Sequence, residues 1–360
     1  MKHAGNAHTF VPRLIFWELT KRCNLHCAHC RAEAGEVDSS GELDLGEIQR
    51  VIDNIAAHYK PIMVLTGGEP LYRDDIFDIA GYAGKKGLPT ALATNGTLID
   101  EATAGRIRDA GFSRVSISID GDCAASHDGL RGIPGSFDDA LRGAALLRDA
   151  GVEFQFNTTI TKRNVNEMEG VLKLAADRGA KALHVFILVP VGCGAQIMES
   201  DMLSPEQCEE ALTWLYDATK RSAIEFKATC APHYYRIIRQ KAKAEGRTLT
   251  FETDGLAAVT RGCLAGSGVC FISNRGDVQP CGYLPLKAGN VKETPFNEIW
   301  EHAPLFADLR DYNKLTGKCG ACSYRAFCGG CRARAFYETG NYLDEEPYCL
   351  YQPAGYTTHT

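Results

Sequence analysis

Three cysteines near the N-terminus have the spacing of a metal-binding loop. Cys23, Cys27 and Cys30 follow one another as C-x3-C-x2-C within the stretch "KRCNLHCAHC". Cysteine binds metals as the thiolate, and a structural zinc or a fully ligated 4Fe–4S cluster requires four of them. Three thiolates leave one coordination position free. The loop therefore predicts either a hydrolytic zinc site or a 4Fe–4S cluster whose fourth iron is open to a ligand.

A second group of cysteines lies in the C-terminal third of the chain. Its eight members are Cys263, Cys270, Cys281, Cys319, Cys322, Cys328, Cys331 and Cys349. Eight thiolates suffice for two fully ligated 4Fe–4S clusters, and two zinc sites are the chemical alternative. Disulfide bonds are the alternative explanation for the 15 cysteines, but a protein stabilised mainly by disulfides is normally much shorter than 360 residues. We therefore expect metal ligation in a reducing cytoplasm.

Composition excludes several classes of partner. The net charge of −6 disfavours binding to nucleic acid or to an anionic membrane surface. Apolar and charged residues make up 45% and 23% of the chain, which is ordinary for a soluble globular protein. The N-terminal stretch has no continuous apolar core of a signal peptide, and no apolar run is long enough to span a membrane.

The elements that must position these cysteines alternate between strand and helix. Short segments rich in β-branched or aromatic residues predict strands at 13–19, 61–66, 89–94, 114–119, 153–160 and 182–189. Amphipathic patterns predict helices at 44–58, 74–86, 100–110, 136–150 and 164–178. Six βα units are too few for a closed eight-stranded barrel, so we expect a partial (β/α)6 TIM-like barrel. Functional loops of parallel α/β folds follow the strands, and the first cysteine loop directly follows the first predicted strand.

The remainder of the chain differs in composition. Residues 204–245 predict two helices, and residues 255–353 are rich in Gly, Cys and Pro with only short apolar runs. We expect a small Cys-rich domain that depends on metal for its stability. The predicted boundaries are 1–200 for the partial barrel, 201–254 for a helical bridge and 255–360 for the Cys-rich domain.

The cysteine loop, together with "GGEP" after the second predicted strand, resembles the radical S-adenosylmethionine (SAM) superfamily. The resemblance implies that the amine and carboxylate of SAM chelate the open iron, and that reductive cleavage yields a 5′-deoxyadenosyl radical that abstracts hydrogen. It assigns the SAM amine to Gly67, Gly68 and Glu69, the ribose or methionyl group to Ser118 and Asp120, and the SAM carboxylate to Arg131. Asn95 and Asn157 are further SAM-binding candidates. His29 occupies a slot usually filled by an aromatic residue near the adenine.

The second cysteine array is similar to the SPASM domain that follows many radical SAM barrels. The resemblance implies two auxiliary 4Fe–4S clusters with interleaved ligands, which we assign by the order of the cysteines in the sequence. Auxiliary cluster I would use Cys263, Cys270, Cys281 and Cys331. Auxiliary cluster II would use Cys319, Cys322, Cys328 and Cys349. The alternative is that Cys270 is not a ligand, in which case cluster I has an open iron or is absent. Buried hydrophobic positions are expected for Cys123, Cys193 and Cys208.

Several stretches, among them "KATCAPHYYR" and "GDVQPCGYLPLKAGNV", resemble the enzymes of the alternative heme pathway. That resemblance implies decarboxylation of two propionates of iron-coproporphyrin III to vinyl groups, giving heme b, with an auxiliary cluster accepting the electrons released. It also implies a tetrapyrrole substrate and a low-potential flavodoxin or ferredoxin as electron donor. Charge-assisted contacts to the propionates are expected from His233, Tyr235, Arg236 and Arg261. No side chain is assigned as a general acid or base.

Three other functions compete with this one. A related enzyme would modify didecarboxysiroheme or a heme d1 precursor, and a SPASM peptide or protein maturase would act on a polypeptide. A non-catalytic iron–sulfur electron carrier would not cleave SAM, and "GGEP" with the residues at the strand ends argues against it.

Overall fold

The computed structural model describes residues 10–255, 258 and 260–356, and one mixed sheet runs through it. The strands are β1 (Leu14–Glu18), β2 (Ile62–Thr66), β3 (Thr90–Thr94), β4 (Arg114–Ser118), β5 (Phe154–Ile160), β6 (Ala182–Ile187), β7 (Glu225–Thr229), β8 (Val269–Ile272), β9 (Asp277–Gln279) and β10 (Gly289–Asn290). Their order in the sheet is β10-β9-β8-β1-β2-β3-β4-β5-β6-β7. Neighbours from β8 through β1 to β7 are parallel, and β9 runs antiparallel to both of its neighbours.

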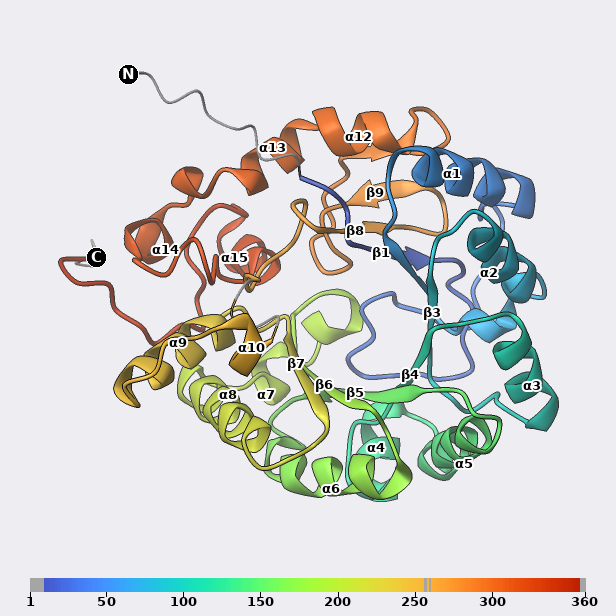
Figure 1. Cartoon of the computed structure of the whole chain (residues 1–360), viewed down its shortest axis with the longest axis horizontal. Helices are drawn as coiled ribbons and strands as arrows, with labels where there is room; N and C mark the ends of the chain where they lie inside the picture. Colours follow the sequence, from blue (N-terminus) through green and yellow to red (C-terminus); the bar gives the residue numbers. More distant parts are fainter. Residues whose placement is uncertain (1–9, 256–257, 259, 357–360) are drawn as a thin grey trace.

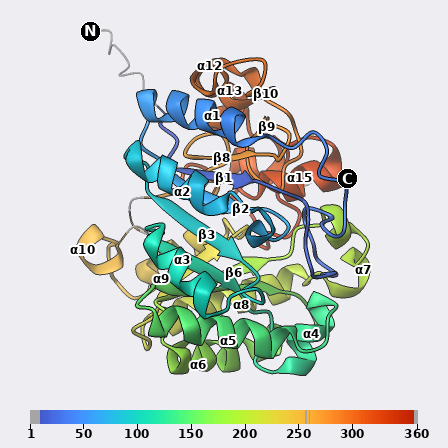
Figure 2. The ribbon, with the colours of Figure 1, turned by 90° about the vertical axis from the view of Figure 1, so that its right-hand side faces the viewer.

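The helices lie mainly outside the curved sheet (Figures 1 and 2). Those of the barrel are α1 (Leu45–His58), α2 (Ile76–Lys85), α3 (Glu101–Asp109), α4 (Ala124–Arg131), α5 (Ser136–Asp149), α6 (Met168–Arg178), α7 (Met198–Asp201), α8 (Pro205–Thr219), α9 (Tyr234–Ala244) and α10 (Phe251–Asp254). The Cys-rich segment contributes α12 (Phe296–His302), α13 (Pro304–Arg310), α14 (Gly317–Ala321) and α15 (Arg332–Thr339). Among the helices of the described ranges, none is both long and apolar enough to cross a membrane.

The predicted partial barrel is confirmed, and each of the six predicted strands overlaps one of β1 to β6. Four strands, β7 to β10, were missed, and two of them extend the parallel part of the sheet at its flanks. The segment predicted as a helical bridge contains β7, which pairs in parallel with β6. The Cys-rich segment supplies β8, which pairs in parallel with β1, so that Cys270 lies beside Ile15. The sheet therefore continues across both predicted domain boundaries.

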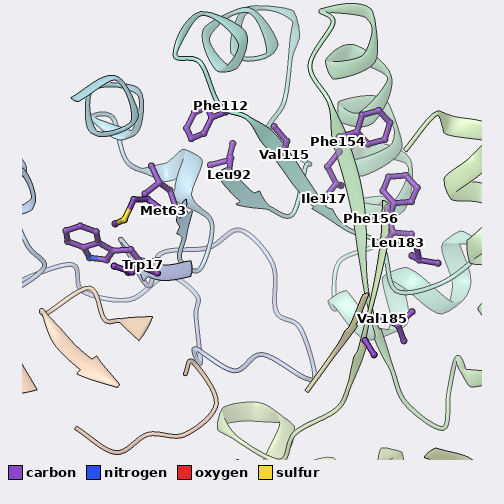
Figure 3. Packing of buried hydrophobic residues seen from close by; sticks show 14 of the residues in the cluster. Trp17, Met63, Leu92, Phe112, Val115, Ile117, Phe154, Phe156, Leu183 and Val185 are labelled. Carbon is purple, nitrogen blue, oxygen red and sulfur yellow. The ribbon is translucent and has the colours of Figure 1, made fainter. Parts of the chain in front are cut away.

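Side chains along each strand alternate between the helix-facing core and the central cavity. Successive side chains of a strand point to opposite faces of the sheet. On β1, Ile15 and Trp17 are fully buried against the helices, whereas Leu14 and Phe16 line a central cavity. Figure 3 shows the same helix-facing layer continuing through the later strands, with Phe156 on β5 among its members. The inner face of the barrel is thus free to carry functional groups.

Candidate active site

The first cysteine loop lies across the carboxyl ends of the barrel strands. It follows β1, and the thiols of Cys23, Cys27 and Cys30 line the central cavity of about 350 Å³. The end of α4 fixes it from one side, because the backbone amide of His26 donates to the Arg131 carbonyl at 3.2 Å. The loop after β6 fixes it from another, through the Cys193 amide and the Cys30 carbonyl at 2.9 Å. The loop is therefore rigidly attached to the barrel.

Each sulfur of this loop receives at least one N–H donor. The Sγ of Cys23 lies 3.5 Å from the backbone nitrogen of Leu25, and that of Cys30 lies 3.4 Å from the nitrogen of Ala34. A guanidinium nitrogen of Arg131 lies 3.7 Å from the Sγ of Cys27. Hydrogen bonds to sulfur stabilise the thiolate form that a metal requires and tune the potential of an iron–sulfur cluster. The donor set fits a thiolate-bound cluster.

Spacing between the thiols distinguishes a cluster from a single zinc ion. A tetrahedral zinc with Zn–S bonds of about 2.3 Å brings its thiolates to about 3.8 Å from one another. In the part of the chain that the structure describes, only Asp122, Cys123 and Glu167 place three potential ligand atoms within 4.8 Å of one another. None of the cysteine sets is that compact. The cysteine sets of the described residues therefore do not have the close ligand spacing of a single tetrahedral zinc ion.

The "GGEP" segment packs directly beneath the cysteine loop. A Cβ atom on Gly68 would lie 2.5 Å from the carbonyl oxygen of Arg22, so only glycine allows this close approach. Gly67 and Gly68 both line the cavity, as predicted for residues that receive the SAM amine. The Glu69 carboxylate does not line it. Burial raises the pKa of Glu69 to about 7, although the carboxylate accepts hydrogen bonds from the Asn95 amide and the Thr94 hydroxyl.

Asp120 acts on its neighbours and does not face the cavity. Its Oδ2 atom lies 2.6 Å from Nη2 of Arg131 and 3.1 Å from Nε2 of His29. Because the side chain is fully buried, desolvation raises the pKa of Asp120, but the Arg131 charge and the contact with His29 outweigh it and hold the pKa below the usual range. Arg131 and His29 both line the cavity. Asp120 is thus placed to orient two cavity residues, which differs from its predicted direct contact with SAM.

The remaining predicted SAM residues reach the cavity from consecutive strand ends. Asn95 follows β3, Ser118 ends β4 and Asn157 belongs to β5, and all three line the cavity. Asn95 also donates from its amide nitrogen to the side-chain oxygen of Asn24 in the cysteine loop at 2.9 Å. The inner faces of neighbouring strands bring these residues together, as the barrel prediction requires.

The predicted auxiliary cluster II set is gathered in one place. Cys319, Cys322, Cys328 and Cys349 line a small second pocket. Backbone N–H groups approach three of its sulfurs, with those of Glu346, Tyr324 and Gly330 at 3.3 to 3.4 Å. Four thiols with this hydrogen bonding fit a fully ligated cluster.

Of the four cysteines predicted to bind auxiliary cluster I, three lie together and one lies elsewhere. Cys263, Cys281 and Cys331 line the central cavity. They are far from the first cysteine loop in sequence, but they face the same cavity. Cys270 is separate from them, because it is fully buried in the core beneath β8. Desolvation raises the pKa of Cys270, and the charged group that acts on its thiol is Arg310. Sequence order assigns Cys270 to this set, but the structure places its thiol apart from the other three.

The four predicted substrate residues divide between the two pockets. Tyr235 and Arg261 line the central cavity. His233 and Arg236 line the second pocket, beside the cysteines of cluster II, so they are not placed to contact a ligand in the central cavity. Arg236 is also paired with Glu209 of α8 at 2.5 Å. The structure therefore places these two predicted substrate residues outside the central cavity.

Sequence reasoning missed three cations of the cavity, Arg31, Lys227 and Arg332. Lys227 lies on β7 and lines the cavity next to Cys230. Burial lowers the pKa of its ammonium group. A lysine alternating with apolar residues in "EFKAT" was the available signal, but it required β7 to be recognised as a strand.

Comparison with known proteins agrees with this geometry. Residues 17–175 match the family model described as the radical SAM superfamily, and residues 263–323 match the SPASM model of an iron–sulfur cluster-binding domain. The chain is 52% identical to an AdoMet-dependent heme synthase of Methanosarcina barkeri, over 96% of this chain and 99% of the relative. It is 49% identical to an AdoMet-dependent heme synthase of Nitratidesulfovibrio vulgaris, over 95% and 93% of the two chains.

The fold also resembles a solved structure. The crystal structure of Streptococcus suis SuiB bound to S-adenosylmethionine superposes with a TM-score of 0.76 at 17% sequence identity. The match covers 95% of this chain and 78% of SuiB. At that identity the likeness concerns the fold alone.

Proposed function

This chain belongs to the radical SAM superfamily and carries a SPASM iron–sulfur domain, and from that premise we propose that it makes heme b by decarboxylating two propionates of iron-coproporphyrin III to vinyl groups. It is a radical SAM enzyme that uses 4Fe–4S clusters and SAM. Relatives that match nearly its whole length are named AdoMet-dependent heme synthase, which supports heme formation. The identity of the porphyrin and the two decarboxylations are the proposal.

The charge of the central cavity is the observation that carries this proposal. Its lining includes the cationic side chains of Arg31, Arg131, Lys227, Arg261 and Arg332. Within the described residues no aspartate or glutamate lines it. A cavity of this kind attracts a ligand with several carboxylates and disfavours a cationic one. A porphyrin with propionate side chains has the charge that the lining requires.

Three of these cations, Lys227, Arg261 and Arg332, have no carboxylate partner among the described residues, although Arg332 donates to the backbone carbonyls of Tyr342 and Asp344. Across residues 10–255, 258 and 260–356, no carboxylate lies within 4.0 Å of Lys227 or Arg261 to form an ion pair. The Nε and Nη1 atoms of Arg261 are also buried without a hydrogen-bond partner in the described structure. Buried N–H groups normally have acceptors. We infer that substrate propionates supply them, and the planar guanidinium suits a carboxylate in particular.

The apolar part of the lining suits the macrocycle. Phe16, Phe186, Phe271 and Tyr283 come from different parts of the cavity wall. Aromatic and aliphatic faces with a few placed polar groups are the common lining of cofactor-sized sites. The cations would hold the propionates at the rim of the ring, while these faces exclude water from it.

The positions of the cysteine sets fit the electron balance of the reaction. SAM bound at the first cysteine set supplies hydrogen-atom abstraction. On the substrate side, each propionate loses one hydrogen atom, one CO2 and one electron as its vinyl group forms. That electron needs an acceptor, and Cys263, Cys281 and Cys331 line the same cavity as Cys23, Cys27 and Cys30. An auxiliary cluster would thus adjoin the substrate. A low-potential flavodoxin or ferredoxin is proposed to deliver the electrons that SAM cleavage consumes.

Turnover with defined substrates tests the proposal. The cluster-loaded protein is incubated without oxygen with SAM, a reductant and either iron-coproporphyrin III or didecarboxysiroheme, and the products are identified by mass spectrometry. Conversion of the first substrate to heme b supports the proposal. Conversion of didecarboxysiroheme alone would assign the chain to a different tetrapyrrole reaction. SAM cleavage with neither substrate modified would favour a peptide or protein maturase.

A further inference from the structure

The cavity wall that holds Cys263, Cys281 and Cys331 contains a fourth thiol. Cys230 follows β7 directly and lines the same cavity. It packs, together with Cys281, against the small hydrophobic cluster that contains Cys331. We propose that Cys230, and not Cys270, is the fourth ligand of auxiliary cluster I, so that this cluster is closed by four thiolates. The proposal concerns ligation and holds for any substrate.

Strand alternation excludes Cys270 from this role. Val269 and Phe271 of β8 line the cavity, so Cys270 between them points to the opposite face of the sheet. There it packs among the helix-facing core residues, with no solvent-exposed surface. Bringing its thiol into the cavity would require a one-residue shift of β8 against β1, which would also turn Phe271 and Val269 away from the cavity.

The backbone at Cys230 is held in a conformation that its side chain disfavours. Its φ angle is 55°, in the left-handed region, which is unfavourable for a residue other than glycine. Such strain persists where surrounding structure imposes it and is common at functional sites. Here the Nη2 atom of Arg334 donates to the Cys230 carbonyl at 2.6 Å, and the Nε atom of the same arginine donates to Glu346 at 2.9 Å. A buried ion pair thus fixes the residue that carries the thiol.

The same ion pair connects Cys230 to Cys331, another of the proposed ligands. The backbone amide of Cys331 donates to Oε2 of Glu346 at 2.6 Å, and Arg334 pairs with Oε1 of that carboxylate. Cys230 and Cys331 are therefore oriented by one network, although 100 residues separate them in the chain. Arg334 and Glu346 are both fully buried, so they form a rigid support and contact no substrate.

Four thiolates would define the role of this cluster. A cluster with three cysteines keeps one iron open for a ligand, as the first set does, whereas a cluster with four has no such position. Auxiliary cluster I would then transfer electrons and would not bind a substrate carboxylate through iron. It would also attach the Cys-rich segment to the barrel, since Cys230 follows the last barrel strand.

Iron counting in a simplified background tests the assignment. Cys23, Cys27 and Cys30 are replaced by Ala, so that the chain holds only auxiliary clusters, about eight irons if both are present. Into this background go Cys230→Ala, Cys230→Ser and, as the matched control, Cys270→Ala. After anaerobic reconstitution we measure iron, sulfide and the EPR spectrum of the reduced protein. We expect Cys230→Ala to lose up to about four irons or to change the EPR signal of one cluster, and Cys270→Ala to change neither.

Two results of this experiment would contradict the assignment of Cys230. Unchanged iron, sulfide and EPR in both Cys230 variants would overturn the proposal, as would loss of a cluster on replacement of Cys270 alone in a chain whose circular dichroism is that of the parent. Alkylation mapped by mass spectrometry gives a readout without mutation. In the native protein Cys230 should be protected until a chelator removes the clusters, while the exposed Cys123 should react throughout. Reaction of Cys230 in the fully loaded protein would also contradict the assignment.

Discussion

Arg131 and Asp120 form a buried ion pair in which Nη2 lies 2.6 Å from Oδ2, directly beside the first cysteine loop. The other terminal nitrogen of Arg131 reaches the Sγ of Cys27 at 3.7 Å. One carboxylate therefore fixes a cation against a thiolate that is expected to bind iron. The pair connects the end of β4 to the loop that follows β1.

Removing the Asp120 charge should destabilise the protein strongly. In Asp120→Asn, the Arg131 cation stays buried without its counter-ion, and breaking a buried pair in this way costs about 3–5 kcal/mol. The exposed Lys173–Asp177 pair provides the control, because Asp177→Asn should cost at most about 1 kcal/mol. Chemical unfolding under argon measures both variants. Equal, small losses would show that Asp120 does not carry this role.

Gly68→Ala should disrupt the cysteine loop. The added methyl would lie 2.5 Å from the Arg22 carbonyl oxygen and 2.8 Å from that of Lys21, and neither backbone atom can move without shifting the loop. We expect a loss of about 1–3 kcal/mol in stability together with impaired SAM cleavage. Gly81→Ala in α2 is the control, because nothing lies within 4 Å of its Cβ. That substitution should leave SAM cleavage unchanged; normal cleavage by Gly68→Ala would contradict the close packing.

Glu69 should make stability depend on pH near neutrality. Burial raises its pKa to about 7 in the folded chain, against about 4.3 when unfolded. The folded state therefore binds the proton more tightly. Stability from this group is complete below the unfolded pKa and is lost as pH rises through about 7. Relative to Glu69→Gln, the melting temperature of the parent should fall between about pH 4.5 and about pH 7 and level off at higher pH. If the melting temperatures of the two proteins change with pH in the same way, the result would contradict the raised pKa of Glu69.

Lys227 should contribute to substrate binding without affecting SAM. Lys227→Met keeps the length of the side chain but removes the cation from the cavity. A hydrogen bond to a charged group is worth about 1.5–3 kcal/mol, so we expect KM for the porphyrin to rise roughly 10- to 100-fold. Cleavage of SAM in the absence of porphyrin should remain at the parental rate. Lys173→Met, on the exposed face of α6, is the control, and an unchanged KM for Lys227→Met would remove this lysine from the site.

The sequence predicted the barrel well because its strands are apolar and its helices amphipathic. It failed at β7, where the alternation in "EFKAT" is only five residues long and pairing with β6 decides the conformation. It failed at Cys270 because cysteine order cannot reveal which face of β8 a side chain occupies. Arg236 was misplaced for a similar reason, since its partner Glu209 lies on another helix. Long-range pairing determined all three.

The central claim is that this enzyme converts propionates of iron-coproporphyrin III to vinyl groups. The most direct measurement is anaerobic turnover of the cluster-loaded protein with SAM and a reductant, followed by chromatography and mass spectrometry of the porphyrin and of 5′-deoxyadenosine. We predict heme b, a product lighter than the neutral substrate by two CO2 and four hydrogen atoms, with two equivalents of 5′-deoxyadenosine per heme. Active SAM cleavage that leaves the mass of iron-coproporphyrin III unchanged would contradict the claim.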